Sequence, residues 1–334
     1  MKPPNREKYF EGKLSDYSPY VDTLSGVKRL KFWFNIWRDK RKAERKLKES
    51  INKGECFFGP FKGEFGHFLA HTAPFVGYLH SHGVKVHYCG MELHKPFLID
   101  ENGESLVTSY SSLRDFFGEV KPSANITSTP EDVTREIDRF KKKAEESDLP
   151  FWNIDDEYYY WFIHRNWITD NGYGETPNLE MTYKTRDENS AVIFARKKGA
   201  AKSSNNGEPW DYMRLARTIS PFFDKVYLAG HPSLSDNTLK AEGNIQLSLS
   251  TDNRDILESC SNASLILTQH SGACFIGEYT NSQVLTIYKG DGPIGSVRNT
   301  LRFKDYIGQK YPLEFAFSEE EVVSFVEDFV KRRK

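Results

Sequence analysis

The chain has 334 residues, 38% of them hydrophobic and 28% charged, and its formal net charge is −1. This composition excludes a disordered chain, and without a basic excess it argues against nucleic acid as a partner. No apolar run reaches the roughly 18 residues of a membrane span, and the N-terminal MKPPNREKYF lacks the apolar core of a signal peptide. We therefore expect a cytoplasmic protein of two domains, at about 150 residues each.

The first half predicts one long basic helix followed by alternating strands and helices. Residues 26–53 form the helix, with an apolar patch from Leu30 to Trp37 and a strongly charged second half. Residues 150–188 are dense in aromatic side chains and end in a Gly-, Asn- and Pro-rich stretch, which we interpret as the interdomain link. The other expected elements are strands at 55–61, 84–89 and 106–110 and helices after 66 and at 130–147.

The second half has a more regular alternation of short apolar runs and helical patterns. Strands are expected at 191–195, 225–229, 245–249, 264–268 and 284–288, and helices at 210–220, 252–260, 273–279 and 318–332. Such alternation predicts parallel sheets with helices on both faces. The fold class is therefore α/β, with two Rossmann-like domains and parallel sheets. The expected units are an N-terminal domain at 1–165, a C-terminal domain at 190–317 and a C-terminal helix at 318–334.

The first candidate site is the segment Gly63-Glu64-Phe65-Gly66-His67, which follows the first predicted strand. Glycines between a strand and a helix allow a ligand to approach the backbone closely. Glu64 or His67 could take the proton from an acceptor hydroxyl, and Glu64 is the preferred base. A tight turn with Glu64 capping the helix is the structural alternative.

The second candidate site is Arg196-Lys197-Lys198, directly after the strand AVIFA. Cations at the carboxyl end of a strand suit a diphosphate leaving group, because negative charge develops as the sugar–phosphate bond breaks. A solvated basic loop is the alternative reading.

The third candidate site is Gln269-His270-Ser271-Gly272, at the start of the helix expected at 273–279. Backbone amides at a helix start bind phosphate, and Ser271 adds a hydroxyl donor. Two further residues are weaker candidates for the same ligand. Glu278 could accept ribose hydroxyls, and His231, in the loop Gly230-His231-Pro232, could flank a base or ribose.

A metal centre is not predicted. His67 and His71 are four residues apart and share a helix face, but HFLAH lacks the glutamate of a zinc-binding HExxH pattern. An Asp-x-Asp pair after a strand is also missing. The four cysteines form no CxxC pair and have apolar neighbours, so buried free thiols are expected.

These segments together resemble the GT-B glycosyltransferases that build bacterial surface polysaccharide. The resemblance rests on AVIFARKKG, DKVYLAGHP and ILESCSNASLILTQHSGACFIGEY in the second half and on GPFKGEFGHFL in the first. It implies a nucleotide-sugar donor held by the second domain and a glycan or other hydroxyl acceptor held by the first. The two domains would face each other across a cleft, in which the reaction takes place. It also implies that no metal or cofactor is needed, and that the C-terminal helix packs back toward the first domain. The usual His-Gly and Glu-x7-Glu patterns are missing from the segments that carry this resemblance, so the donor and the stereochemistry stay open.

Other functions remain open at this point. A GT-B-fold sugar-nucleotide epimerase would use the same donor site without a polymer acceptor, and a polysaccharide pyruvyl transferase would not bind a nucleotide. The basic, aromatic-tipped segment 28–48 predicts contact with an anionic membrane surface, either in a peripheral enzyme or in a non-catalytic binding module. A surface helix with one packed face is the plainer reading of that segment.

Overall fold

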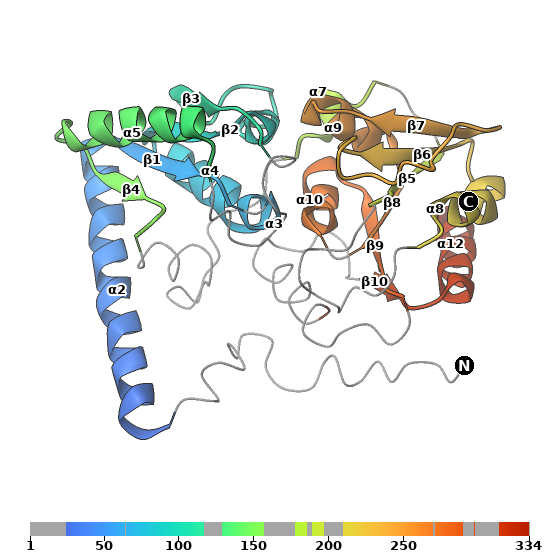
Figure 1. Cartoon of the computed structure of the whole chain (residues 1–334), viewed down its shortest axis with the longest axis horizontal. Coiled ribbons are helices and arrows are strands. Elements are labelled where there is room, and N and C mark those ends of the chain that lie inside the picture. Colours follow the sequence, from blue (N-terminus) through green and yellow to red (C-terminus); the bar gives the residue numbers. More distant parts are fainter. Residues whose placement is uncertain are drawn as a thin grey trace.

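Two parallel β-sheets, one in each half of the chain, organise the computed structural model (Figure 1). The structure describes residues 25–63, 65–116, 129–156, 178–185, 189–196, 210–269, 271–289, 297 and 314–333. Within these residues the secondary structure is mixed α/β, and every strand pair is parallel apart from three isolated antiparallel bridges.

The first sheet has four strands in the order β3-β2-β1-β4. Its strands are β1 (Glu55–Phe61), β2 (Lys85–Met91), β3 (Ser109–Leu113) and β4 (Phe151–Asn153). Its helices are α2 (Gly26–Lys53), α3 (Phe65–His67), the π-helix η2 (Phe68–Thr72), α4 (Ala73–Ser81), the 3-10 helix η3 (Glu92–Phe97) and α5 (Glu131–Glu145). The long helix α2 ends at Gly54, whose left-handed backbone (φ 67°) directs its N–H to the carbonyls of Ser50 and Ile51.

The second sheet has six strands in the order β10-β9-β8-β5-β6-β7. Its strands are β5 (Ser190–Phe194), β6 (Lys225–Gly230), β7 (Ile245–Leu249), β8 (Leu265–Thr268), β9 (Gln283–Ile287) and β10 (Glu314–Ala316). Its helices are α7 (Glu180–Tyr183), α8 (Tyr212–Ile219), η6 (Ser220–Phe222), α9 (Asn253–Asn262), η7 (Gly272–Phe275), α10 (Ile276–Thr280) and α12 (Glu319–Arg333). This is the doubly wound order, in which the chain runs outward from β5 in one direction and then from β8 in the other.

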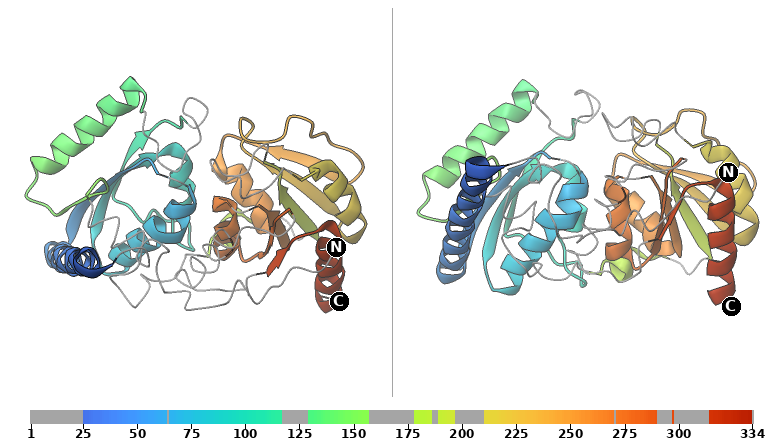
Figure 2. Two further views of the ribbon diagram at one scale, coloured as in Figure 1. Left: turned by 60° about the horizontal axis from the view of Figure 1, so that its bottom comes forward. Right: turned by 90° about the horizontal axis from the view of Figure 1, so that it is seen from below.

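Alternate residues of each strand belong to different cores, as the two-residue period of a strand requires. In β5, Val192 and Phe194 pack with α9, η7 and α10, whereas Ala191 and Ile193 pack with α8 and α12. Figure 2 shows α9 and α10 on the side of the second sheet that is turned toward the first domain, and α8 and α12 on its outer side. In the first domain α2 and α4 share a core, and α5 covers the other face of the sheet.

The two domains share one of these cores. Buried side chains of the first domain, including Phe68 and Phe97, belong to the same apolar cluster as Ile256 and Phe275 of the second. Polar contacts cross the same boundary. Tyr279 donates its hydroxyl to the Leu69 carbonyl at 2.6 Å, and the Asn253 amide donates to the Leu93 carbonyl at 2.7 Å.

Most predicted elements are present with small shifts of their ends. The predicted helix 26–53 and strand 55–61 coincide with α2 and β1. The strand expected at 106–110 lies later, at Ser109–Leu113, where it pairs with β2. β4 and β10 were not anticipated, since three residues carry too little alternation to reveal a strand. All four cysteines are free and buried, as expected.

The C-terminal helix α12 differs from the expectation that it packs back toward the first domain. Its apolar residues Val322, Val326 and Phe329 lie in the outer core of the second domain, beside α8. Glu319 in its first turn also forms an ion pair with Arg214 of α8 at 3.0 Å. The sequence correctly predicts the apolar face of this helix, but the pattern alone does not identify the sheet on which that face packs.

Candidate functional site

The order in which the chain adds strands to the second sheet reverses between the adjacent strands β5 and β8. Phe194 of β5 lies beside Thr268 of β8 in register, so the loops that start at Ala195 and Gln269 leave the sheet side by side. Ligands of doubly wound sheets bind at the carboxyl ends of the strands around such a reversal. Two of the segments that the sequence singled out therefore meet at the edge where a ligand is expected.

Arg196 is half-buried and leads out of β5. It forms an isolated bridge with Ser235, and the Asp236 N–H donates to the Ala195 carbonyl at 3.0 Å. Tyr212, buried beneath, lies against the Arg196 backbone. The start of the loop is thus held by the chain around it. Lys197 and Lys198 lie outside the described residues.

His231 belongs to the loop that holds Arg196. Its carbonyl accepts the N–H groups of Leu234 and Ser235, each at 3.0 Å, and Ser235 is the residue bridged to Arg196. Its ring Nδ1 lies 2.8 Å from the Ser233 hydroxyl and accepts the Ser233 N–H at 3.2 Å. Burial lowers the pKa of His231, so the ring is neutral near pH 7, with Nε2–H as its remaining donor.

Gln269 follows β8 and is only 1% exposed. Within the described residues, neither its side-chain oxygen nor its side-chain nitrogen has a hydrogen-bond partner. Its backbone carbonyl is satisfied, since it accepts the Thr268 hydroxyl at 2.9 Å. A buried amide with both polar atoms unmatched is costly, and such groups are often completed by a bound molecule or water.

Ser271 and Gly272 start the helical segment as predicted, but its first turn is the 3-10 helix η7 and the α-helical part, α10, has only five residues. The Ser271 hydroxyl caps this start, accepting the Ala273 N–H at 3.3 Å and lying 3.2 Å from the Thr268 hydroxyl. His270 lies outside the described residues. Glu278 is 1% exposed within α10, so a ribose would have to reach it from within packed protein.

In the first domain the segment after β1 has an unusual helical start. Phe65–His67 is a three-residue α-turn, Phe68–Thr72 is a π-helix, and α4 follows directly. Single π turns inside helices occur frequently at functional sites. His67 is half-buried, with its ring 6.1 Å from that of His71. Gly63 lies against the ring of Phe61, and Glu64 lies outside the described residues.

The glycine segments of the two domains touch each other. A methyl group built on Gly272 would lie 2.8 Å from the Gly66 nitrogen and 2.8 Å from the Phe65 ring. One built on Gly66 would lie 3.3 Å from the Gly272 Cα. Glycine is therefore required at Gly272 by the neighbouring domain, not by its own backbone angles. The structure brings together the two glycine-containing segments that the sequence proposed for acceptor and donor.

Two groups beside this junction were not assigned roles from the sequence. His94 of η3 is fully buried and stacks on Phe68 with ring centroids 4.1 Å apart, and burial lowers its pKa to about 3. Asn253, which starts α9, makes the interdomain contact to Leu93. Only the fold reveals them, because each depends on a partner far away in the chain.

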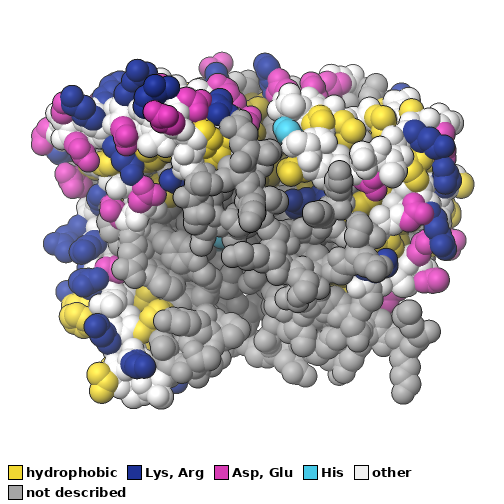
Figure 3. All heavy atoms as spheres, viewed as in Figure 1, with side chains coloured by type: hydrophobic (Ala, Val, Ile, Leu, Met, Phe, Trp, Pro, Cys, Tyr) yellow, Lys and Arg dark blue, Asp and Glu magenta, His cyan; other side chains and the backbone are white. Residues whose placement is uncertain are grey.

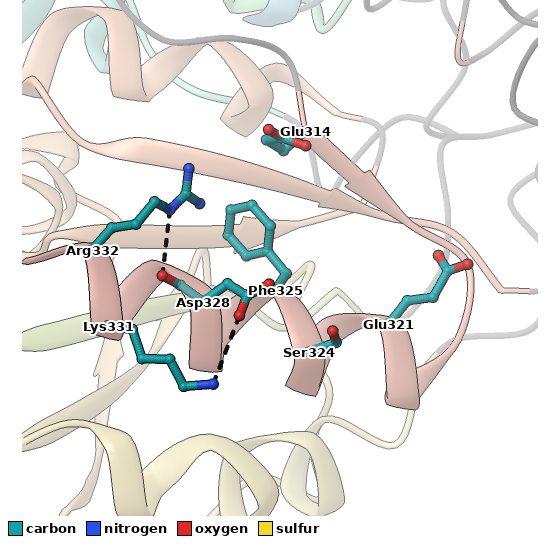
Figure 4. A pocket seen from close by; sticks show the side chains of 7 residues that line it. All are labelled: Glu314, Glu321, Ser324, Phe325, Asp328, Lys331 and Arg332. Carbon is teal, nitrogen blue, oxygen red and sulfur yellow. Dashed lines mark hydrogen bonds and ion pairs between the residues drawn. The ribbon is translucent and has the colours of Figure 1, made fainter.

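Two surface hollows outlined by described residues lie away from these groups. The larger, of about 640 Å³, lies between β10 and α12 (Figure 4). Two of its cations contact Asp328: Lys331 lies 3.8 Å from the Asp328 carboxylate, and the Arg332 guanidinium donates to the Asp328 carbonyl at 3.3 Å. The second, of about 490 Å³, lies beside β3 and the start of α5. Neither includes a predicted site residue.

Among the described residues, no three His, Cys, Asp or Glu side chains are grouped so that they could hold a metal ion. In the same part of the chain, no helix combines the length and the apolar character needed to cross a bilayer.

Comparison with solved structures identifies the architecture. The ADP-heptose LPS heptosyltransferase II of E. coli superimposes with a TM-score of 0.50 at 11% identity, over 84% of this chain and 99% of that one. This chain has the GT-B fold. The E. coli heptosyltransferase WaaC with ADP-2-deoxy-2-fluoro heptose gives 0.47 at 10% identity, over 84% and 99% of the two chains. A family 9 glycosyl transferase of Veillonella parvula gives 0.46 at 11% identity, over 83% and 97%.

Sequence comparison adds no family to the GT-B fold. No protein-family profile matches the chain, and no curated protein matches it. At 11% identity the structural likeness establishes the fold and leaves donor, acceptor and site residues to be argued from the chain itself.

Proposed function

We propose that the protein is a glycosyltransferase that moves a sugar from a nucleotide-sugar donor to a glycan or other hydroxyl acceptor. The observation that carries the proposal is the convergence of Arg196 and the Gln269–Gly272 segment at the strand reversal of the second sheet. A half-buried arginine and a buried, unmatched amide are suited to a diphosphate and its nucleoside. The GT-B fold of the chain is compatible with such a donor site.

In this proposal the acceptor hydroxyl attacks the anomeric carbon of the donor sugar as the bond from that carbon to the diphosphate oxygen breaks. Glu64 takes the hydroxyl proton, with His67 as the alternative base. The charge that develops on the diphosphate is met by Arg196 with Lys197 and Lys198, and by the backbone N–H groups at Ser271 and Gly272. His231 and His270 contact the nucleoside or sugar. Glu278, the other residue singled out for this ligand, is 1% exposed within α10 and is assigned no direct contact.

The reaction requires the acceptor side of the first domain to face the donor side of the second across a cleft. The contact of Gly66 with Gly272 supports this arrangement, because it sets the segment that includes His67 against the segment that starts η7. The proposed reaction uses protein groups alone for charge and proton transfer, without a metal or cofactor. Contact with a membrane through residues 28–48 is a separate question.

The test is to incubate the protein with a panel of nucleotide sugars and a mixture of bacterial glycan acceptors, and to measure release of free nucleotide and a mass increase of the acceptor. We expect release with one donor, coupled to acceptor modification. Conversion of the donor sugar without any acceptor would point to the epimerase. Transfer of a pyruvyl group from phosphoenolpyruvate, with no nucleotide-sugar turnover, would point to the pyruvyl transferase. Either result would overturn the proposal.

A further inference from the structure

The first three turns of α2 expose an unusual amount of apolar surface. Seven large hydrophobic side chains are exposed among the described residues, and five of them lie on this part of α2. They are Val27 (80%), Leu30 (72%), Trp33 (44%), Phe34 (59%) and Trp37 (47%). Single exposed apolar residues are ordinary, but a contiguous group marks an interaction surface.

This apolar stripe lies on the side of α2 opposite to the one that packs on the first domain. At about 100° per residue, its members fall on one side of the helix. The residues that pack on the first domain, including Phe32, Ile36 and Ala43, fall on the opposite side. The fold therefore uses one face of α2 for its core, and the stripe is not needed for that packing. Figure 1 shows α2 along the outer edge of the first domain, remote from the second.

Basic side chains continue the stripe along the helix. Arg41, Arg45 and Lys48 are exposed and lie on the same side, one to three turns further on. The Arg41 guanidinium stacks on the Trp37 ring at 4.1 Å from its centroid. Residues 26–53 carry eleven Lys and Arg against three Asp and Glu, a net charge of +8 in a chain whose total is −1. Figure 3 shows apolar side chains at the lower left, over the start of α2, and cations along the edge above them.

We propose that α2 docks the first domain on an anionic lipid bilayer. The stripe Val27–Trp37 enters the boundary between headgroups and acyl chains, and the cations of the second half lie at the lipid phosphates. Interfacial helices combine these two features, and tryptophan is enriched at that depth of a bilayer. The convex shape of a helix with outward aromatic rings suits a fluid surface, and the excess of cations suits a negatively charged one.

The test is co-sedimentation of the full-length protein with two vesicle types, one of phosphatidylcholine alone and one with about a third phosphatidylglycerol. We expect binding to the anionic vesicles and weak binding to the neutral ones. Phe34→Ser with Trp37→Ser should lower the anionic partition coefficient by roughly tenfold or more, because two inserted rings are lost. Arg41→Glu, Arg45→Glu and Lys48→Glu together should lower it by a similar factor and remove its salt dependence.

A matched control is available on α5. Arg135, Lys142 and Lys143 are exposed cations, and changing all three to Glu alters the net charge equally. This control should bind anionic vesicles nearly as well as the unchanged protein. Equal loss in the control would mean that total charge, and not α2, drives binding, and would overturn the proposal.

Two other results would also overturn it. One is no binding to either vesicle type. The other is a dimer in sedimentation velocity that the Phe34→Ser, Trp37→Ser variant abolishes, since the stripe would then be covered by a second copy.

The membrane proposal does not depend on the proposed glycosyltransferase activity. We therefore expect the stripe variants to bind nucleotide like the unchanged protein. Loss of nucleotide binding with intact vesicle binding would leave the docking surface standing.

Discussion

The two domains share a parallel α/β plan but present different chemistry where their strands end. The second sheet, with six strands, places Arg196 and the buried amide of Gln269 around its reversal. The first sheet, with four strands, places glycines and the half-buried His67 there. Cations and amides suit a charged leaving group, whereas groups that can accept a proton suit a hydroxyl nucleophile. In the proposed function, this difference corresponds to donor binding by the second domain and proton transfer by the first.

Replacing the proposed base should have the largest effect. Glu64→Gln removes proton acceptance while keeping the size of the side chain. We expect turnover to fall by about 10²–10⁴-fold while nucleotide affinity is unchanged. Steady-state rates together with nucleotide titration measure both. His67→Gln is the parallel variant: if it abolishes turnover while Glu64→Gln retains near-normal rates, the base is His67.

The buried histidine of the first domain should make stability depend on pH. The pKa of His94 is lowered to about 3 by burial, and an unfolded histidine titrates near 6.5. As pH falls through this window only the unfolded chain gains the proton, so the free energy of unfolding should fall by about 1.4 kcal/mol per pH unit. His94→Phe should flatten that slope in urea unfolding between about pH 6 and pH 4. His82→Phe, at an exposed histidine, is the matched variant that also loses an imidazole ring. An unaltered slope in His94→Phe would show that other groups set the acid sensitivity.

The donor side is tested by Arg196→Ala. Loss of a charge-assisted contact to a phosphate should weaken nucleotide binding by about 1.5–3 kcal/mol, or roughly ten- to a hundredfold. Calorimetric titration measures this. Arg332→Ala, at the far end of α12, serves as the control and should bind normally. Equal affinity in both variants would remove Arg196 from the donor site.

The junction between the domains is tested by Gly272→Ala. Its methyl group would meet the Gly66 nitrogen at 2.8 Å, so the domains must shift apart locally, and we expect a loss of about 1–3 kcal/mol in stability. Gly77→Ala, within α4, is the matched control, since among the described residues its methyl group would meet Leu106 alone, at 3.9 Å. That change should be neutral or slightly stabilising. Similar thermal midpoints for both variants would mean that the glycine contact is not maintained in solution.

The sequence predicted the second domain better than the first for a physical reason. Runs such as those of β5, β6 and β8 are buried on both faces and bounded by clear turn residues, so local pattern was enough. The three-residue β4 depends on its pairing with β1. The packing of α12 on the second domain also depends on the assembled fold.

The sequence predicted separate segments of the candidate site, and only the structure shows which of them lie together. The glycine segments and Arg196 were found from their positions after apolar runs, because loops at strand ends bind ligands in such folds. Their meeting at Gly66 and Gly272 could not be read from residues so far apart in the chain. The burial of Gln269 and His94 likewise follows from long-range packing.

The central claim, that the second domain binds a nucleotide, is tested most directly by thermal shift against UDP, GDP, ADP, CMP and dTDP. A ligand that binds only the folded state must raise the unfolding temperature. We predict a clear shift with one nucleotide in the unchanged protein, and a smaller shift with that nucleotide in Arg196→Ala. The absence of a shift with every nucleotide, at concentrations up to several millimolar and with acceptor glycans added, would contradict the account.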